Sequence, residues 1–480
     1  MNKRFFLFLI LMIGIFVRIF NLGKHSFWCD ELLAISLGKH SIRWMIDYIT
    51  FNDAHPPLFY AMVHFWLKLG KNEFILRILP LIFGIMCIPS SYFLGEKFKN
   101  EKTGLFLSLF ISLSPPLILW SQIIKSYTLF TFLTILSFIS FLNYIEKKEK
   151  IFLINLAIFN ILLLYTHNLA FIVILIQILS LIILRKLDLT VLFSLLIILI
   201  FYFPWLLRIP YQIIFTLGVR RPVPIILRFP YTLFYFFLGE TINPFNFQIL
   251  VPIFLLYLFL IPFCLKSFWE LNDEKKWILI ISLFLPLILV FFPSTVPQNL
   301  IPFSIFYLLF YSLGLENLNK KSRFSLFFFL TLMPSLYFYY SNDPFQYQDA
   351  SKLIPYKEIY EKIQKFEKEG DLIFTTENID KNILAPIQWY YHGKNQIIEI
   401  ENEEDFKKIS DLAKNKTRFF LILDNINRFE VSERVKNFFK LNFEKIYEEK
   451  FIFNEKLLSK LKGKREYYYL VEMYIFKKKE

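Results

Sequence analysis

Residues able to carry acid–base chemistry are concentrated in a short stretch near the N-terminus. Asp30 and Glu31 are adjacent, and Asp53 and His55 follow in the same loop, residues 23–57. Ionisable side chains held at the end of a membrane helix are costly and often functional. A carboxylate can act as a general base toward a hydroxyl or amine acceptor. We therefore expect this loop to be catalytic, with Asp30, Glu31 and Asp53 as the candidate catalytic residues.

Each of these residues also has an ordinary structural explanation. Asp30 and Glu31 could be a solvated pair at the membrane interface. Asp53 could be a turn residue, and His55, which precedes two prolines, could cap a helix. In the catalytic interpretation, Asp53 and His55 face Asp30 across one pocket and orient the acceptor or a donor phosphate.

Candidates for substrate binding are polar and cationic residues scattered over the rest of the chain. They are His55, Lys125, Tyr127, His167, Arg220, Arg221 and Gln298. Cations of this kind suit a phosphate-bearing lipid head group. The alternative is that Lys125 and the two arginines snorkel at the interface, and that His167 is an interfacial anchor.

Long apolar segments must position these residues. The chain has 480 residues, of which 56% are hydrophobic, which is more than is usual in a soluble domain. A membrane-spanning helix needs about 20 apolar residues. We expect roughly eleven spans, the first of them retained rather than cleaved, at residues 1–21, 74–95, 103–114, 119–142, 151–165, 169–184, 189–206, 249–265, 277–292, 300–315 and 324–340.

Basic residues recur in every second loop, around residues 97–102, 147–150, 185–186, 266–276 and 320–323. The positive-inside rule places these loops and the N-terminus in the cytoplasm. The net charge of +14 is then largely a topology signal rather than a sign of a nucleic-acid partner. The expected location is the cell (inner or plasma) membrane. With an odd number of spans, the C-terminal domain is then extracytoplasmic, and the candidate site residues gather on the same outer face of the membrane.

The composition divides the chain into two expected domains. Residues 1–342 form the membrane domain, in which the proline-rich loop 207–248 lacks regular helix and acts as an ordered lid. Residues 343–480 form a small α/β domain. Its expected helices are 357–368 and 404–414, and its expected strands are 372–376, 419–423 and 467–476.

These motifs, taken in order, resemble the GT-C superfamily of integral-membrane glycosyltransferases. The closest branch is the glycosyltransferase 39 family, which includes protein O-mannosyltransferases and the lipid A aminoarabinose transferase. The residues that carry the resemblance are 27–31, 53–60, 74–80, 114–115, 121–127, 165–167, 203–206, 239–241 and 298–300. The resemblance implies a mainly α, polytopic transmembrane helical bundle with a small extracytoplasmic α/β domain.

The resemblance also implies an inverting transfer of a sugar from a polyprenyl-phosphate donor, with Asp30 as the base that activates the acceptor. A lipid phosphate is a good leaving group, so cations need only stabilise its developing charge. The family usually has Glu and Arg where this chain has Ile123 and Lys125, and Arg-Tyr where it has Gln298-Asn299. Lysine keeps the charge but loses the fork that grips phosphate, so Arg220 or Arg221 would assist Lys125.

The expected partners are a polyprenyl-phosphate sugar and a protein, lipid or glycan acceptor, with no nucleic acid. No cofactor is indicated, although Asp30, Glu31 and His55 could ligate a divalent metal. Two other functions remain open: a flippase or transporter for lipid-linked sugars, and a non-catalytic scaffold of the cell envelope. Transporters often contain internal repeats and midplane polar sites, and neither is evident in this sequence.

Overall fold

The computed structural model describes residues 3–218, 225–239, 241–291, 295–318, 336–337, 339–341, 350–413, 417–425, 429–455 and 467–479. Its internal contacts divide the chain into two compact units. The larger unit comprises Met1–Leu22 and Gly38–Ser341, and the smaller unit comprises Gly23–Leu37 and Asn342–Glu480. The segment that carries Asp30 and Glu31 therefore packs with the C-terminal residues, whereas the sequence analysis grouped it with the membrane domain.

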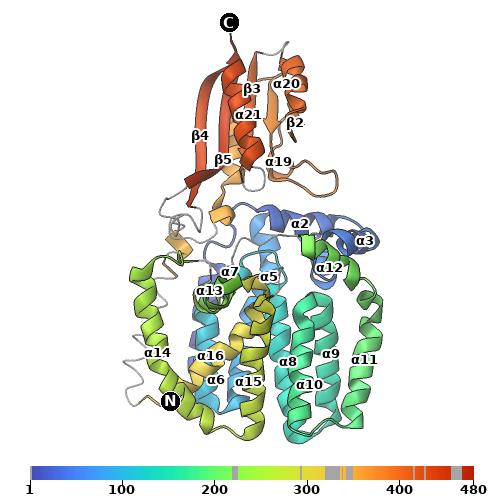
Figure 1. Ribbon diagram of the computed structural model, residues 1–480, viewed down its shortest axis with the longest axis vertical. Coiled ribbons are helices and arrows are strands. Elements are labelled where there is room, and N and C mark those ends of the chain that lie inside the picture. The colour runs from blue at the N-terminus through green and yellow to red at the C-terminus, as the bar shows by residue number, and fades with distance from the viewer. Residues whose placement is uncertain are drawn as a thin grey trace. The chain divides into compact units, whose positions relative to one another are not determined.

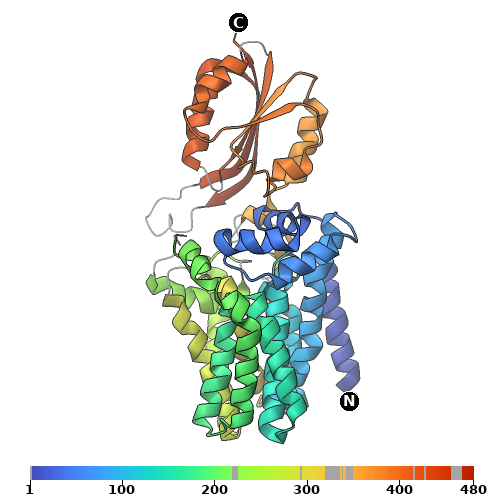
Figure 2. The ribbon, with the colours of Figure 1, turned by 90° about the vertical axis from the view of Figure 1, so that its right-hand side faces the viewer.

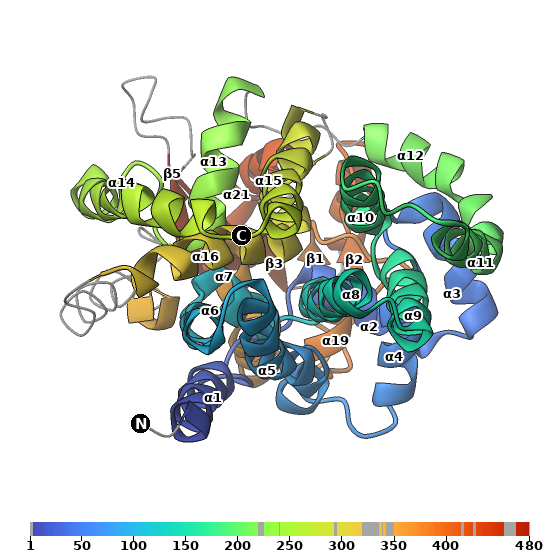
Figure 3. The same ribbon diagram turned by 90° about the horizontal axis from the view of Figure 1, so that it is seen from below.

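The larger unit is a bundle of helices (Figure 1). Its elements are α1 (Lys3–Ile19), α3 (Ile42–Asn52), α4 (Leu58–Trp66), α5 (Glu73–Phe98), α6 (Glu101–Leu113), α7 (Pro115–Ser121), α8 (Tyr127–Lys147), α9 (Lys150–Thr166), η1 (Asn168–Ala170), α10 (Phe171–Ile183), α11 (Leu189–Leu206), α12 (Ile209–Gly218), α13 (Ile225–Leu238), α14 (Phe247–Trp269), α15 (Asp273–Ile288), η2 (Leu289–Phe291), η3 (Pro297–Leu300) and α16 (Ile301–Glu316). Viewed end-on, α5 lies beside α6 and α8 beside α9 (Figure 3). Helix α2 (Cys29–Lys39) begins in the smaller unit and ends in the larger one.

Several of these helices can cross a membrane. Among the described residues, five are long and apolar enough, or six if α6 and α7, bent by 58° at their junction, form one span. The five are α5, α8, α11, α14 and the continuous helix Pro297–Glu316. A multi-pass membrane fold is thus confirmed. The number of eleven spans stays a prediction, because α9 and α10 are shorter and most of the segment 324–340 lies outside the described residues.

Two expectations about this unit are wrong. The segment 119–142 is not one span, because α7 ends at Ser121 and α8 begins only at Tyr127. The loop 207–248 is not devoid of helix, because it contains α12 and α13 despite its prolines. One proline lies in the first turn of α12, where it costs no hydrogen bond, and Pro230 lies inside α13. Packing in an apolar bundle tolerates such interior prolines.

A buried arginine holds the bend between α6 and α7. Arg18, in the last turn of α1, is fully buried. Its guanidinium donates to the carbonyl oxygens of Ile111 at 2.7 Å and Ser112 at 2.6 Å, and to the Ser121 hydroxyl at 3.2 Å. Because α6 stops before Pro115, its last carbonyls have no intrahelical partner. Arg18 supplies that partner and fixes where the polar stretch after α7 begins.

The smaller unit contains a five-stranded sheet with strand order β2-β1-β3-β5-β4. Its elements are η4 (Ala350–Leu353), α18 (Tyr356–Phe366), β1 (Leu372–Thr375), α19 (Pro386–Tyr390), β2 (Gln396–Glu399), α20 (Asp405–Ala413), β3 (Arg418–Asp424), α21 (Phe429–Asn442), β4 (Phe443–Glu455) and β5 (Tyr467–Lys478). Strand β1 is parallel to β2 and β3, and β5 is antiparallel to β3 and β4. Helices cover both faces (Figure 2).

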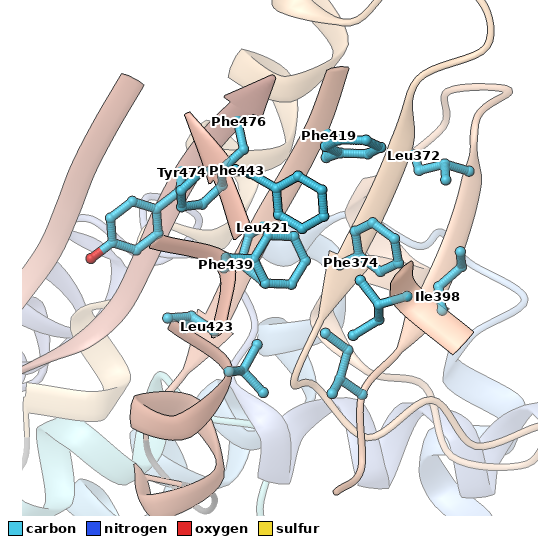
Figure 4. Packing of buried hydrophobic residues seen from close by; sticks show 13 residues of the cluster. Leu372, Phe374, Ile398, Phe419, Leu421, Leu423, Phe439, Phe443, Tyr474 and Phe476 are labelled. Carbon is cyan, nitrogen blue, oxygen red and sulfur yellow. The ribbon is translucent and has the colours of Figure 1, made fainter. Parts of the chain in front are cut away.

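One face of the sheet packs against α20 and α21 through a cluster of aromatic and aliphatic side chains (Figure 4). Phe374 and Phe419 from neighbouring parallel strands meet Phe439 and Ile409 from the two helices. The expected α/β class is confirmed, and each expected helix and strand has its counterpart. The sequence analysis missed β2, β4, α19 and α21.

Candidate active site

Asp53 and His55 form a hydrogen-bonded pair in the turn between α3 and α4. His55 Nδ1 lies 2.9 Å from Asp53 Oδ1, which also accepts from the backbone N–H of Ala54 at 2.6 Å. The hydroxyl of Tyr60, in the first turn of α4, donates to Asp53 Oδ2. A carboxylate surrounded by donors stays ionised, so Nδ1 of His55 carries a hydrogen toward it. The remaining nitrogen, Nε2, is then the one free to meet a ligand.

The charge state of Asp53 follows from these contacts. Burial of the carboxyl raises its pKa, but the charge and hydrogen bond of His55, the charge of Lys125 and the hydrogen bond of Tyr60 together lower the pKa to about 2. The side chain is buried at 6% exposure. Asp53 is therefore a fixed negative charge at physiological pH.

An amide pair holds the backbone of this turn. The Asn168 side-chain amide donates to the carbonyl oxygen of Ala54 at 2.7 Å and to the Gln212 side-chain oxygen at 2.8 Å. Gln212, on α12, in turn donates to the carbonyl oxygens of Ile49 and His55. The turn is thus fixed by residues from η1 and from the long loop, neither of which is its neighbour in sequence.

His167, at the junction of α9 and η1, lies beside His55. The two ring centroids are 5.2 Å apart at 84°, and the His167 ring stacks on Phe130 at 4.9 Å. Nδ1 of His167 accepts from the backbone N–H of Leu169 at 3.1 Å. Burial, followed by the charge of His55, lowers the pKa of His167 well below its usual value. The ring is therefore neutral, and its hydrogen is on Nε2.

That Nε2 is buried and meets no acceptor with hydrogen-bond geometry in the part of the chain that the structure describes. The Asn299 side chain lies near enough to the ring to raise its pKa, and its oxygen accepts from the Tyr127 hydroxyl at 3.0 Å. A buried N–H without a partner costs free energy.

Lys125 follows α7 in the polar stretch before α8 and is buried at 6% exposure. Its charge acts on both Asp53 and His167. A narrow crevice, with no room for a water molecule, is lined by His55, Pro56, Phe59, Tyr60, Lys125, Ser126 and Thr166. Lysines are rarely buried unless they are paired. Lys125 and the imidazole of His55 both line this crevice, which lies within the larger unit.

Asp30 and Glu31 lie in the smaller unit, in the first turn of α2. Acidic side chains there are favoured by the helix dipole. Glu31 is fully buried, and its carboxylate accepts from the backbone N–H of Trp28 at 3.4 Å, which closes the start of the helix. Asp30 is half-buried. Of the two side chains, that of Asp30 is the more exposed to solvent.

The structure thus brings together Asp53, His55, Lys125, Tyr127 and His167. Gln298 lies in η3, where its neighbour Asn299, rather than Gln298, makes the contact to Tyr127. Arg220 and Arg221 lie outside the described residues.

Sequence reasoning missed the positioning residues Tyr60, Asn168, Gln212 and Arg18. Tyr60 lies within the motif 53–60, so its spacing from Asp53 was a usable signal. The contacts of the two amides depend on tertiary folding alone. Among the residues that the structure describes, no three His, Cys, Asp or Glu side chains are arranged to hold a metal ion.

No known protein family and no curated protein matches this chain by sequence. Its structure, however, is similar to that of ArnT from Cupriavidus metallidurans in the apo state, with a TM-score of 0.61 at 9% identity over 98% of this chain and 97% of that chain. The same protein bound to undecaprenyl phosphate matches with a TM-score of 0.54 at 10% identity, over 88% of this chain and 94% of that chain.

A third similar structure is the archaeal oligosaccharyltransferase AglB from Archaeoglobus fulgidus, in complex with an inhibitory peptide and a dolichol-phosphate. It matches with a TM-score of 0.55 at 10% identity, over 92% of this chain and 73% of that chain. The chain therefore has the fold of GT-C membrane glycosyltransferases. The resemblance inferred from the motifs is confirmed at the level of fold.

Proposed function

We propose that this protein transfers a sugar from a polyprenyl-phosphate donor to an acceptor on the outer face of the membrane, with inversion at the sugar carbon. The acceptor is a protein, a lipid or a glycan. Support comes from the fold, which is shared with one protein bound to undecaprenyl phosphate and another in complex with a dolichol-phosphate. Fold alone does not fix function, so the proposal depends on the chemistry of the residues.

The observation that carries the proposal is the buried cation Lys125 beside a second buried donor, the Nε2–H of His167. Lys125 and the Nε2–H of His167 are positive or hydrogen-donating groups kept away from water. Preorganised donors of this kind stabilise negative charge that develops in a transition state. The charge expected on a departing lipid phosphate is of that kind.

Asp30 is proposed as the base that takes the proton of the acceptor hydroxyl or amine. The acceptor oxygen or nitrogen then attacks the sugar carbon, and the bond to the phosphate oxygen breaks, leaving the polyprenyl phosphate. Asp53 orients His55, and Lys125 with Arg220 or Arg221 holds the phosphate. Glu31 contributes by closing the start of the helix that carries Asp30.

The test is direct binding of undecaprenyl phosphate and dolichyl phosphate to the purified protein, followed by transfer of labelled sugar from the matching lipid-linked donors in membranes. Lys125→Ala should weaken phosphate binding roughly 10- to 100-fold, which corresponds to the loss of one charged hydrogen bond. Lys125→Arg should retain most of it. Asp30→Asn should abolish transfer and leave lipid binding unchanged.

Lys68→Ala is the matched control, because Lys68 is an exposed lysine of the same unit that lies over the ring of Phe65. It should change neither binding nor transfer. Equal lipid affinity in wild type, Lys125→Ala and Lys68→Ala would refute Lys125 as the phosphate ligand. Tight lipid binding without transfer to any envelope acceptor would instead favour a flippase or a scaffold.

A further inference from the structure

The segment that carries Asp30 is tied to the rest of the smaller unit at three points. The backbone N–H of Phe27 donates to the Tyr390 hydroxyl at 2.6 Å. Before it, the Ser26 hydroxyl accepts from the backbone N–H of Lys357 at 3.0 Å. Beyond Asp30, the Ser36 hydroxyl accepts from the backbone N–H of Leu384 at 2.9 Å. The anchors therefore lie on both sides of the carboxylate in sequence.

Aromatic packing reinforces the first two anchors. Phe27 is completely buried, and its ring meets that of Trp389 edge-to-face with centroids 5.7 Å apart. The Lys352 ammonium lies 4.9 Å from the centroid of the Trp28 ring. Both partners come from the C-terminal part of the chain.

Helix α19, which carries Trp389 and Tyr390, is itself held by a buried carboxyl group. Glu377 is 2% exposed, accepts from the backbone N–H of Ile387 at 2.9 Å and also accepts from the Tyr360 hydroxyl. The support for the Asp30 segment thus extends into the interior of the unit.

We infer that the smaller unit is a positioning platform for Asp30, and that Tyr390, Ser26 and Ser36 are positioning residues that fix the segment bearing this carboxylate. The inference rests on the proposed function for the role of Asp30. A general base must lie within hydrogen-bond reach of the proton that it abstracts. Small misplacements of a catalytic group lower the rate strongly while leaving binding of the donor intact.

Cys29 is a native reporter of this segment. Burial, followed by the charges of Asp424, Glu377 and Asp30, raises the pKa of its thiol. The Cys29 thiol is half-buried, and a partly covered thiol with a raised pKa reacts slowly with alkylating reagents until the segment opens. Alkylation of Cys29 by N-ethylmaleimide, quantified by peptide mass spectrometry, therefore measures how often the segment opens, without any knowledge of the substrate.

Tyr390→Phe removes only the hydroxyl that holds Phe27. Loss of one neutral hydrogen bond should raise the rate of Cys29 alkylation about fivefold. Tyr391→Phe is the matched control, because Tyr391 is equally buried and its hydroxyl is also hydrogen-bonded, but to Glu367 and Asn395 rather than to the Asp30 segment. Ser36→Ala tests the anchor on the other side of Asp30.

In the transfer assay, Tyr390→Phe and Ser36→Ala should lower kcat and leave KM for the lipid-linked donor unchanged, whereas Tyr391→Phe should change neither. Unchanged Cys29 alkylation in both Tyr390→Phe and Ser36→Ala would overturn the inference, whatever the activity. Faster alkylation with wild-type kcat would also overturn it. Absence of transfer in the wild type would refute the proposed function, and alkylation would still decide whether the anchors hold the segment.

Discussion

Replacing Asp53 by Asn tests the charge network of the candidate site. The substitution keeps the size of the side chain and an oxygen for the donors Ala54 N–H and His55 Nδ1–H. It removes the negative charge that His55 and Lys125 face. The loss should therefore appear as an electrostatic change rather than as a packing defect.

The magnitude follows from the pKa of Asp53, which is lowered from 3.8 to about 2. A shift of that size corresponds to about 2 kcal/mol of stabilisation by the ionised carboxylate. Because the folded-state pKa is the lower one, this stabilisation is present above about pH 4 and is lost as pH falls toward 2. The difference in free energy of unfolding between wild type and Asp53→Asn should therefore have its full value at pH 7 and should nearly vanish at pH 2.

The assay is the midpoint of thermal unfolding of the purified protein in detergent, measured for each variant from pH 7 to pH 2. Asp47→Asn is the control. Asp47 is 62% exposed and lies 3.8 Å from Arg208, and a surface ion pair of this kind contributes little to stability. A midpoint for Asp53→Asn that equals that of Asp47→Asn at pH 7 would refute the argument. A difference from wild type that persists unchanged at pH 2 would refute the electrostatic cause.

Two further predictions concern the supports of the two units. Arg18→Met leaves the carbonyl oxygens of Ile111 and Ser112 without a donor. It should therefore lower the stability of the larger unit in thermal unfolding by about 3 kcal/mol. Lys3→Met is the control and should have little effect, because Lys3 is 57% exposed. Burial, followed by the charge of Asp424, raises the pKa of Glu377 to about 8. The protonated form stabilises the fold at low pH, and that stabilisation is lost as pH rises from about 4.5 through 8. Glu377→Gln should therefore gain stability relative to wild type between pH 5 and pH 9, and parallel pH curves would refute this.

The sequence predicted the class of the fold because hydropathy and charge act over whole segments. Apolar runs long enough to span a membrane need internal hydrogen bonding, so they form helices almost regardless of context. The positions at which a helix is interrupted are harder to predict, because they depend on side chains that are distant in the sequence. The interruption between Ser121 and Tyr127 is stabilised by Arg18, more than a hundred residues away in the sequence. In the sequence, Arg18 lies near the end of the first apolar run, and nothing there indicates its contacts with the ends of α6 and α7.

The candidate site was predictable where the chemistry is local. Asp53 and His55 are two residues apart and bond to each other, so their types and spacing were sufficient. Lys125 and His167 were recognised as polar residues at helix ends, but their burial beside this pair comes from tertiary packing. The distribution of the acidic motifs between two units was not predictable, because Asp30 and Asp53 belong to one loop in sequence.

The charges of the larger unit give a further constraint on donor binding. Asp53 is ionised and shares the field of Lys125, so part of the lysine charge is already compensated. His167 is neutral because burial lowers its pKa, and it offers a hydrogen bond but no charge. A phosphodiester therefore needs a second cation. The glycosyltransferase 39 family, which the motifs resemble, usually has an arginine where this chain has Lys125 and another where it has Gln298. This chain has neither of those arginines. In our proposal, Arg220 and Arg221 therefore neutralise a larger share of the phosphate charge than loop arginines would in a protein that has both.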